Sequence, residues 1–364
     1  MIWFGLTALI FLFIGFLILY RLPVCAAKKE FSPSIPRISV IIPARNEERN
    51  LPRLLGSLKI QTLLPDEIIV VDDNSEDATA RVAEEYGAQV ITSSGLPKGW
   101  LGKPWSCYQG TRKANGDIFV FLDADTFLES EGLKRMMQTF MAGSGVVSIS
   151  PYHKIQRFHE VFSAFFNLMQ LIGVHHFSLS KGRQPKGMFG PCLMISREDY
   201  MNSGGHKAVR GEVLEHYILA DILRNHRIPV HLLSGKGTLN VRMYSEGWKA
   251  LIQGWTKSFT LGAGQTPPIM MRLSVMWISG LLITPVFLLF SFFSHSTLGI
   301  LFWSIIYILY IFQLFIQFLK VGNFPLWSVV LYPVILIFFL AVFIWALYRN
   351  IGDRQISWKG RNIH

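Results

Sequence analysis

Asp123 and Asp125 follow directly after the apolar run 119–122, and they are the residues best placed to do chemistry in this chain. Two carboxylates at this spacing repel each other. Paired oxygen ligands of this kind suit Mg²⁺ or Mn²⁺, with phosphate oxygens completing the coordination. The alternative is a helix cap in which one of the aspartates is solvated. The pair therefore predicts a metal site that serves a phosphate-bearing ligand.

Two more polar clusters follow apolar runs. Arg45 and Glu47 come after the run 38–42, and Asp73 comes after the run 67–71. Each cluster is also a reasonable cap for the next helix, because polar side chains accept hydrogen bonds from the free amides of a helix. If the runs are parallel strands, the clusters meet at one edge of a sheet, where such folds bind ligands.

Short β-rich runs alternate with segments whose apolar residues have helical spacing. This alternation predicts an α/β domain with a mostly parallel, Rossmann-like sheet and helices on both faces. The expected strands are 38–42, 67–71, 89–92 and 117–122, and the expected helices are 51–58 and 78–86.

The composition adds a membrane part to this domain. Hydrophobic residues make up 51% of the chain and charged residues 16%, whereas a soluble domain carries about 25% charged residues. The segment 2–20 has no charged residue and is long enough to cross about 30 Å of hydrocarbon as a helix. The alternative is a signal peptide, but that begins with a basic region, and here the first charge is Arg21. Arg21, Lys28 and Lys29 place this end of the anchor in the cytoplasm.

Three further apolar runs, 273–293, 298–319 and 326–348, are expected to be transmembrane helices. Three spans after a cytoplasmic domain leave the C-terminus outside, whereas the basic tail favours the inside. Either one run is re-entrant or interfacial, or the tail breaks the rule. The basic residues of the tail are Arg349, Arg354, Lys359 and Arg361.

The predicted organisation is a multi-pass protein of the cell membrane whose main domain is cytoplasmic. It consists of an anchor at 1–21, a cytoplasmic α/β domain at 22–271, transmembrane helices at 272–348 and a basic tail at 349–364. The apolar stretch 159–177 fits either an interfacial helix or a buried core helix.

The formal net charge of +11 does not predict a nucleic acid as a partner. The basic residues are dispersed or lie next to apolar runs, and no nucleic-acid-binding motif is present. The three cysteines are far apart in the sequence, so they form neither a disulfide framework nor a metal motif.

Taken in order, the motifs SVIIPARNE, VVDDNS, a Gly-Lys element and FLDADT resemble the family 2 glycosyltransferases of the GT-A fold, over residues 37–260. The resemblance implies an inverting glycosyltransferase that uses a UDP-sugar and Mg²⁺ or Mn²⁺. It also implies roles for individual residues. The loop that holds the nucleotide is expected to consist of Pro43, Ala44, Arg45 and Glu47. Asp73 is expected to read the uracil edge, and Lys103 to lie beside the nucleotide sugar. Asp123 is expected to bind the ribose or sugar, and Asp125 to be the principal metal ligand. For Lys103 the alternative is a surface lysine in a Gly/Pro loop.

The position of the catalytic base departs from the family pattern. The family carries an Asp in a Glu-Asp pair at the start of a helix, and here the pair is Glu215 and His216. His216 can act as a base near neutral pH. Glu215 is the alternative base, and His216 can also be purely structural. A further hypothesis is an acceptor that is already ionised, such as a carboxylate, which needs no strong base.

The processive members of the family carry a Gln-x-x-Arg-Trp motif, which is absent here in that form. Gln253, Trp255 and Lys257 are candidates to border the acceptor or the diphosphate. Trp and Lys are also common at a membrane interface without a catalytic reason. The missing motif argues against a polysaccharide synthase and favours a single transfer to a lipid-like acceptor.

The segment 95–106 and the arrangement of apolar runs resemble the carotenoid-modifying branch of the family. This implies transfer of glucose to the carboxylate of a C30 carotenoid acid, giving a glycosyl ester. The expected partners are a UDP-sugar, an apolar lipid or carotenoid and the membrane, and other carotenoid-pathway enzymes are candidates. The alternatives are a polyprenyl-phosphate, hopanoid or other lipid glycosyltransferase, and a non-catalytic membrane scaffold.

Overall fold

The computed structural model describes residues 2–25, 35–179, 185–262, 265–352, 356–358 and 361–363. The chain forms two compact units, each made of segments that are distant in the sequence. The helical unit comprises Met1–Leu22, Ile155–Arg183 and Tyr244–Asp353, and the sheet unit comprises Pro23–Lys154, Gln184–Met243 and Arg354–His364. Four of the basic residues used above to predict topology, Lys28, Lys29, Arg354 and Lys359, lie outside the described residues.

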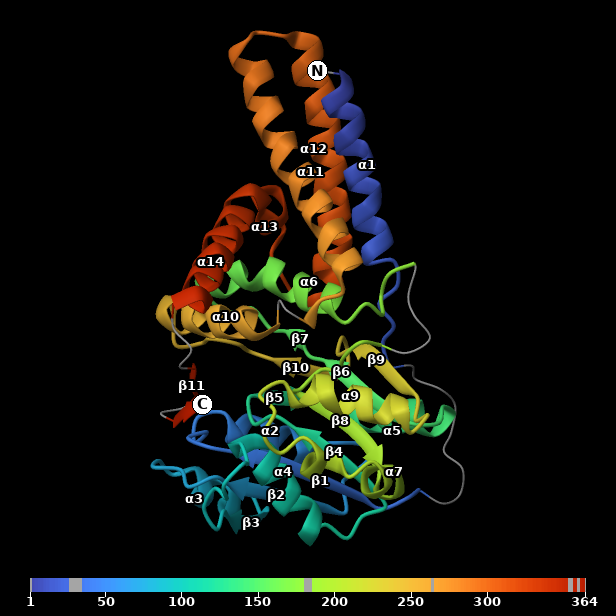
Figure 1. Ribbon diagram of the computed structural model, residues 1–364, viewed down its shortest axis with the longest axis vertical. Coiled ribbons are helices and arrows are strands. Elements are labelled where there is room, and N and C mark those ends of the chain that lie inside the picture. The colour runs from blue at the N-terminus through green and yellow to red at the C-terminus, as the bar shows by residue number, and fades with distance from the viewer. Residues whose placement is uncertain are drawn as a thin grey trace. The chain divides into compact units, whose positions relative to one another are not determined.

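The sheet unit is built on a seven-stranded sheet with the strand order β3-β2-β1-β4-β8-β6-β9 (Figure 1). Strands β3, β2, β1 and β4 are parallel, β8 is antiparallel to both of its neighbours, and β9 is parallel to β6. This confirms the predicted mostly parallel α/β sheet. The strands are β1 (Ile38–Ala44), β2 (Glu67–Asp72), β3 (Gln89–Thr92), β4 (Ile118–Leu122), β6 (Val146–Ser150), β8 (Cys192–Ser196) and β9 (Val230–Ser234).

Successive residues of a strand point to opposite faces of the sheet, and both faces are buried here. Val40 and Ile42 of β1 belong to the core that includes Leu54 of α2 (Leu51–Lys59). Ile41 points the other way, where a Cβ on Gly110 of α4 (Gly102–Lys113) would press into its side chain. Helices therefore cover the sheet on both sides. The others in this unit are α3 (Thr79–Glu85), α5 (Gly132–Ala142), α7 (Arg197–Asn202), α8 (Gly205–Ala208) and α9 (Glu215–Asn225).

Helix α4 is an element that the sequence did not predict. Its first turn holds Gly102, Lys103 and Pro104, which suggested a loop. Proline is tolerated in the first turn of a helix, because the amide that it lacks has no partner there in any case. Lys103 therefore projects from a helix.

A small second sheet continues from the carboxyl end of β4. Its order is β5-β10-β7, with β5 at Thr126–Leu128, β10 at Leu239–Val241 and β7 at Tyr152–His153. Because β5 begins directly after Asp125, the turn that carries both aspartates is fixed at each end by a strand. A two-stranded sheet forms from β11 (Ile356–Trp358) and β12 (Arg361–Ile363).

In the helical unit, α1 (Ile2–Ile18), α11 (Pro268–Phe293) and α12 (Thr297–Val321) run side by side (Figure 1). Among the described residues, α11 and α12 are the two helices that are long and apolar enough to cross a membrane, judged by length and composition alone. The apolar parts of α1 and of α14 (Tyr332–Gly352) are shorter.

Polar side chains of α12 hold α1 through its backbone. Tyr310 Oη donates a hydrogen bond to the carbonyl oxygen of Ala8 (2.8 Å), and Gln313 Nε2 donates to that of Leu12 (2.7 Å). Gln317 Nε2 donates to the carbonyl oxygen of Gly15 (3.0 Å). These three donors lie at helical spacing on one face of α12, so α1 is an integral part of the unit.

The run 326–348 does not form one continuous helix. It divides into α13 (Leu326–Val330) and α14, with Leu331 between them. Tyr332, the first residue of α14, donates to the carbonyl oxygen of Leu281 (3.1 Å), and its ring stacks on Tyr307 with the centroids 5.1 Å apart. Both partners lie midway along α11 and α12.

Further along α14, Phe339 approaches Phe165, which in turn contacts Phe318 near the end of α12. Helix α14 therefore runs from the middle of the α11–α12 pair back toward the C-terminal end of α12. The expected count of three spanning C-terminal helices is thus not confirmed.

The stretch 159–177 begins inside a 3₁₀ helix (Phe158–Ser163) and continues into α6 (Ala164–Gly173). Eight of the ten residues of α6 are buried. Phe166 stacks on Trp255 of α10 (Trp248–Gly262), with the centroids 4.8 Å apart. Between the two interpretations of this stretch, the burial favours a core helix.

Candidate active site

A lysine and two carboxylates meet where β4 ends. Lys103 Nζ lies 2.6 Å from Oδ1 of Asp123 and 3.7 Å from Oε1 of Glu215, and it donates to the carbonyl oxygen of Gly190 at 3.1 Å. Burial disfavours the charged ammonium, but the two carboxylates outweigh this and raise the pKa of Lys103 above its usual value. Lys103 is thus a fixed cation within a negatively charged cluster.

Glu215 and His216 are the first two residues of α9. The Glu215 side chain is only 10% exposed, and its Oε1 lies 3.8 Å from Nδ1 of His216. Burial alone raises the pKa of Glu215, but the His216 side chain and the Lys103 charge overcome it and hold the pKa at about 2. Glu215 is therefore ionised at neutral pH.

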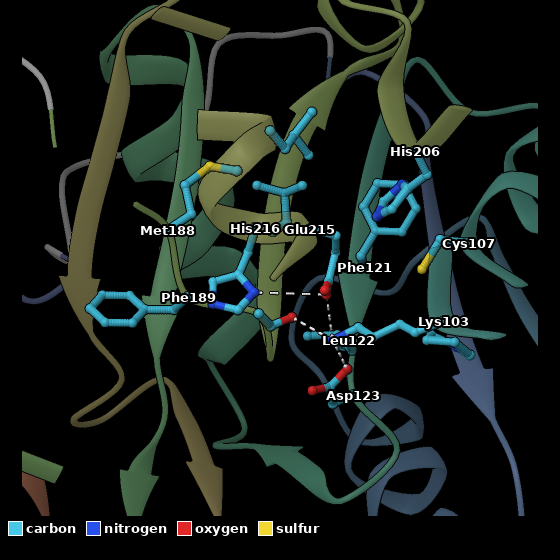
Figure 2. Close-up of a pocket in the computed structure, with 14 residues that line it drawn as sticks. Lys103, Cys107, Phe121, Leu122, Asp123, Met188, Phe189, His206, Glu215 and His216 are labelled. Carbon is cyan, nitrogen blue, oxygen red and sulfur yellow. Dashed lines mark hydrogen bonds and ion pairs between the residues drawn. The ribbon is translucent and has the colours of Figure 1, made fainter. Parts of the chain in front are cut away.

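One pocket gathers these groups (Figure 2). Lys103, Asp123, Glu215 and His216 point toward one another on its polar side. A Cβ added at Gly190 would lie 3.5 Å from both Lys103 Nζ and His216 Nδ1, so the absence of a side chain there keeps the space between them open. The remaining lining is Pro43, Cys107, Phe121, Leu122, Met188, Phe189, Leu193, His206 and Leu219.

His206 is a pocket residue that was not predicted from the sequence. It is 4% exposed, and its ring packs edge-on against Phe121. Burial lowers its pKa to about 4, helped by the Lys103 charge and opposed by Glu215. In the sequence, two glycines, Gly204 and Gly205, directly precede it, and in the structure both have positive φ.

The loops after β1 and β2 are joined by hydrogen bonds. Arg45 Nη1 donates to the carbonyl oxygen of Asp73 (2.8 Å), and the backbone amide of Asp73 donates to the carbonyl oxygen of Ala44 (2.8 Å). Glu47 accepts from Asn50 Nδ2 (2.6 Å), at the start of α2. Arg45 and Asp73 are buried, so the loop predicted to hold the nucleotide is both packed and hydrogen-bonded where these residues meet.

Asp125 lies two residues beyond the Lys103–Asp123 pair and is partly exposed. Within the part of the chain that the structure describes, no group of three or more His, Cys, Asp or Glu side chains is arranged to hold a metal ion. The oxygen donors that are present fit Mg²⁺ or Mn²⁺ when phosphate oxygens supply the remaining ligands, because Mg²⁺ is usually bound by one or two carboxylates plus substrate phosphates.

Gln253, Trp255 and Lys257 lie on α10 in the helical unit, whereas all the other predicted site residues lie in the sheet unit. Trp255 is fully buried, and its indole nitrogen donates to Ser163 Oγ (3.0 Å). Gln253 is exposed and Lys257 is intermediate. Trp255 therefore has a packing role within its own unit.

Comparisons with known proteins identify the family of this chain. The family model described as "Glycosyl transferase family 2" matches residues 39–204. A 4,4'-diaponeurosporenoate glycosyltransferase of Staphylococcus aureus (strain USA300) is 36% identical over 329 residues, which are 89% of this chain and 87% of that protein. The protein of the same name from strain bovine RF122 / ET3-1 matches with the same identity and coverage.

Among solved structures, a mannosyltransferase from Pyrobaculum calidifontis, in complex with GDP-Man and Mn²⁺, superposes with a TM-score of 0.56 at 15% identity. The match covers 96% of this chain and 95% of that one, so the two share a fold. The identity and coverage of the S. aureus relatives confirm the resemblance drawn from the motifs: this chain is a glycosyltransferase and belongs to glycosyltransferase family 2.

Proposed function

We propose that this glycosyltransferase moves a hexose, with glucose as the expected sugar, from a UDP-sugar to the carboxylate of a C30 carotenoid acid, as in synthesis of staphyloxanthin-type pigments. The observation that carries the proposal is the pair Glu215 and His216 facing Lys103 across one pocket. An ionised acceptor needs charge and orientation there rather than a strong base. The name of the S. aureus relatives supports the same acceptor.

In the proposed reaction, a carboxylate oxygen of the acceptor attacks the anomeric carbon of the sugar. The bond from that carbon to the diphosphate oxygen breaks, UDP leaves with the bonding electrons, and the configuration inverts. The transition state has oxocarbenium character. No proton is transferred, because the acceptor is already ionised. Lys103 and Asp123 orient the sugar and the diphosphate, and His216 orients the acceptor.

Asp125 would hold Mg²⁺ or Mn²⁺ together with the nucleotide diphosphate. A bound divalent cation stabilises the charge that develops on a leaving diphosphate. We assign Pro43, Ala44, Arg45, Glu47 and Asp73 to the nucleotide because the loops after β1 and β2 are joined close to Asp73.

The proposed topology has three membrane spans, α1, α11 and α12, followed by a re-entrant hairpin formed by α13 and α14. The support is the path of α14, from Tyr332 beside Leu281 back to Phe339 near the end of α12. A hairpin that enters and leaves on the same side keeps the basic tail in the cytoplasm, which removes the conflict with the positive-inside rule.

Labelling of single cysteines tests this topology, since Cys25, Cys107 and Cys192 are buried. In intact cells, an impermeant maleimide should label Ser294→Cys, between α11 and α12, and should not label a cysteine added after His364. Labelling of the added C-terminal cysteine would show that α14 crosses the membrane.

The enzymatic proposal is tested with membranes that contain the protein, labelled UDP-sugars and a C30 carotenoid acid, with and without Mn²⁺. The expected product is a glycosyl ester, identified by mass spectrometry. Sugar found instead on polyprenyl phosphate or on hopanoids would replace the carotenoid assignment. Absence of transfer to the carotenoid acid by a folded protein would overturn the acceptor assignment.

The role of His216 is tested by substitution to Ala and to Asp with the true acceptor. If His216 orients a carboxylate, Ala lowers kcat moderately and Asp does not restore it. A loss of about 10³-fold with Ala that is recovered with Asp would indicate general base catalysis on an alcohol, because general bases contribute roughly 10²–10⁴-fold.

A further inference from the structure

His206 lines the pocket, and the two nitrogens of its ring differ in their surroundings because the Tyr200 phenol lies beside Nδ1. Nδ1 is 3.0 Å from the phenol oxygen of Tyr200, and that same oxygen accepts a hydrogen bond from the backbone amide of His206 at 3.1 Å. The phenol also has a side-chain hydrogen bond with Thr111. In the arrangement used here, the phenol accepts from the amide and donates its own proton to Nδ1. The proton of the neutral imidazole is then on Nε2, since a neutral ring has one donor and one acceptor nitrogen.

Both partners keep these protonation states at neutral pH. Burial raises the pKa of Tyr200 well above its usual value, so the phenol stays protonated. The pKa of His206 is held at about 4, so its ring stays neutral. The described hydrogen bonds of His206 to Tyr200 involve Nδ1 and the backbone amide rather than Nε2, and the backbone carbonyl of His206 accepts from the amide of Val209.

The chain is built to hold this geometry. Tyr200 is 3% exposed and packs against both Phe119 and Phe121 of β4. Gly205 adopts φ +48°, and a Cβ at this position would overlap the Tyr200 ring. The close approach of Gly205 to this ring places the next amide, that of His206, over the phenol oxygen.

The chemistry around the pocket indicates what His206 binds. Asp123 and Glu215 accept hydrogen bonds, whereas Lys103 and a His206 Nε2–H donate them. A hydroxyl group both donates and accepts, so a ligand rich in hydroxyls satisfies such a mixed lining. An ionised carboxylate or phosphate has no proton to donate, so by itself it cannot form hydrogen bonds with Asp123 and Glu215.

We propose that His206 donates from Nε2 to a hydroxyl of the transferred sugar and so helps to select the donor, and that Tyr200 is the positioning residue that keeps the proton on Nε2. This rests on the proposed use of a UDP-hexose, but not on the identity of the acceptor.

The test is equilibrium binding, measured by calorimetry on the full chain in detergent with Mn²⁺, so that no acceptor is needed. The ligands are the UDP-hexose that the wild type binds most tightly and its 2-, 3-, 4- and 6-deoxy analogues. The proteins are the wild type, His206→Phe, His206→Gln and Tyr200→Phe. Thermal unfolding establishes that each variant is folded.

The expected result is a penalty of roughly 10-fold in Kd for one deoxy analogue with the wild type, the size of one hydrogen bond. That penalty should vanish in His206→Phe, persist in part in His206→Gln, which retains an N–H donor, and be reduced in Tyr200→Phe. The penalties for the other analogues should be unchanged.

A different pattern overturns the assignment. If His206→Phe weakens all five ligands by the same factor, or if every deoxy penalty survives in it, His206 contacts no sugar hydroxyl. If the wild type binds no UDP-hexose at all, the proposed function fails as well, and this outcome is distinct from the first two.

Discussion

Lys103 Nζ and Asp123 Oδ1 lie 2.6 Å apart, one on the first turn of α4 and the other at the end of β4. The same nitrogen also faces Glu215, so a single cation stands between two carboxylates from different elements. The pocket is therefore held together by charge before any ligand enters. The effects of mutations in the pocket on stability and activity follow from this pairing.

Replacing Lys103 by Met should inactivate the enzyme and destabilise the fold. The change leaves Asp123 and Glu215 near each other without a cation. Breaking a fully buried pair costs about 3 kcal/mol or more, and this pair, with side chains 24% and 28% exposed, should cost less. We expect kcat/KM to fall by at least about 100-fold, the effect of about 2.7 kcal/mol on the transition state. Lys98→Met, at an exposed position nearby, is the control and should change neither quantity. Adding Glu215→Gln to Lys103→Met should recover part of the unfolding free energy but not the activity; no recovery would contradict the pairing.

Acid should remove a stabilising contribution of Glu215. Its pKa is about 2 in the folded protein, against an ordinary value of 4.5. A depressed pKa stabilises the fold above pH 4.5, and this stabilisation is lost as the pH falls from 4.5 to 2. The difference in thermal stability between wild type and Glu215→Gln should therefore be constant from pH 7 to 5 and shrink below pH 4.5. A difference that does not change down to pH 3 would show that Glu215 is not held ionised by its neighbours.

A methyl group at Gly190 should block the donor without disturbing the fold. The new Cβ meets Lys103 Nζ and His216 Nδ1 at 3.5 Å, an ordinary contact distance. We expect Gly190→Ala to unfold at the wild-type temperature while KM for the UDP-sugar rises by roughly 10-fold or more, because it occupies the space beside the reacting groups. Gly56→Ala, on α2 and away from the pocket, is the matched control. An unchanged KM would place the sugar elsewhere.

Changing Asp125 to Asn should weaken the response to metal. Removal of a carboxylate ligand should raise the Mn²⁺ concentration needed for half-maximal activity by at least about 10-fold, the lower end of the effect of outer-shell changes. Asp117→Asn is the control, since Asp117 adjoins the other end of β4 and pairs with the exposed Arg37 at 3.6 Å. Full activity of the wild type after exhaustive chelation would contradict the metal assignment.

Gln313 should contribute to the stability of the helical unit through two hydrogen bonds. Its side chain accepts from Trp277 Nε1 (2.8 Å) and donates to the carbonyl oxygen of Leu12. We expect Gln313→Leu to lower the unfolding free energy by about 1 kcal/mol, as for polar contacts between membrane helices. Gln170→Leu, at an exposed position of α6, should cost less in the same detergent. Equal effects of the two substitutions would show that α12 does not hold α1 through Gln313.

Short-range patterns in the sequence predict the part of the fold that carries the site. The apolar runs that become β1, β2 and β4 are too short and too rich in β-branched residues for helices, so they are predicted to be strands. The positions where these strands end, and the side chains found there, can therefore be predicted from the sequence. Lys103 is different, because Gly102 and Pro104 indicate a loop and only the packing of α4 on the sheet establishes the helix. His206 could not be predicted as a site residue, because its proposed role depends on its contact with Tyr200. That contact forms only when α7 and α8 have folded together. Composition does not distinguish a helix that crosses a membrane from one that turns back, so the sequence alone leaves open whether the run 326–348 spans.

The bonds from α12 to the backbone of α1 have a consequence for biosynthesis. The donors Tyr310, Gln313 and Gln317 follow their acceptors by 301 or 302 residues. Helix α1 is therefore translated 301 or 302 residues before the donors that bind its backbone. A chain that ends before residue 310 lacks all three donors, so α1 would have to be held by packing alone, mainly against α11.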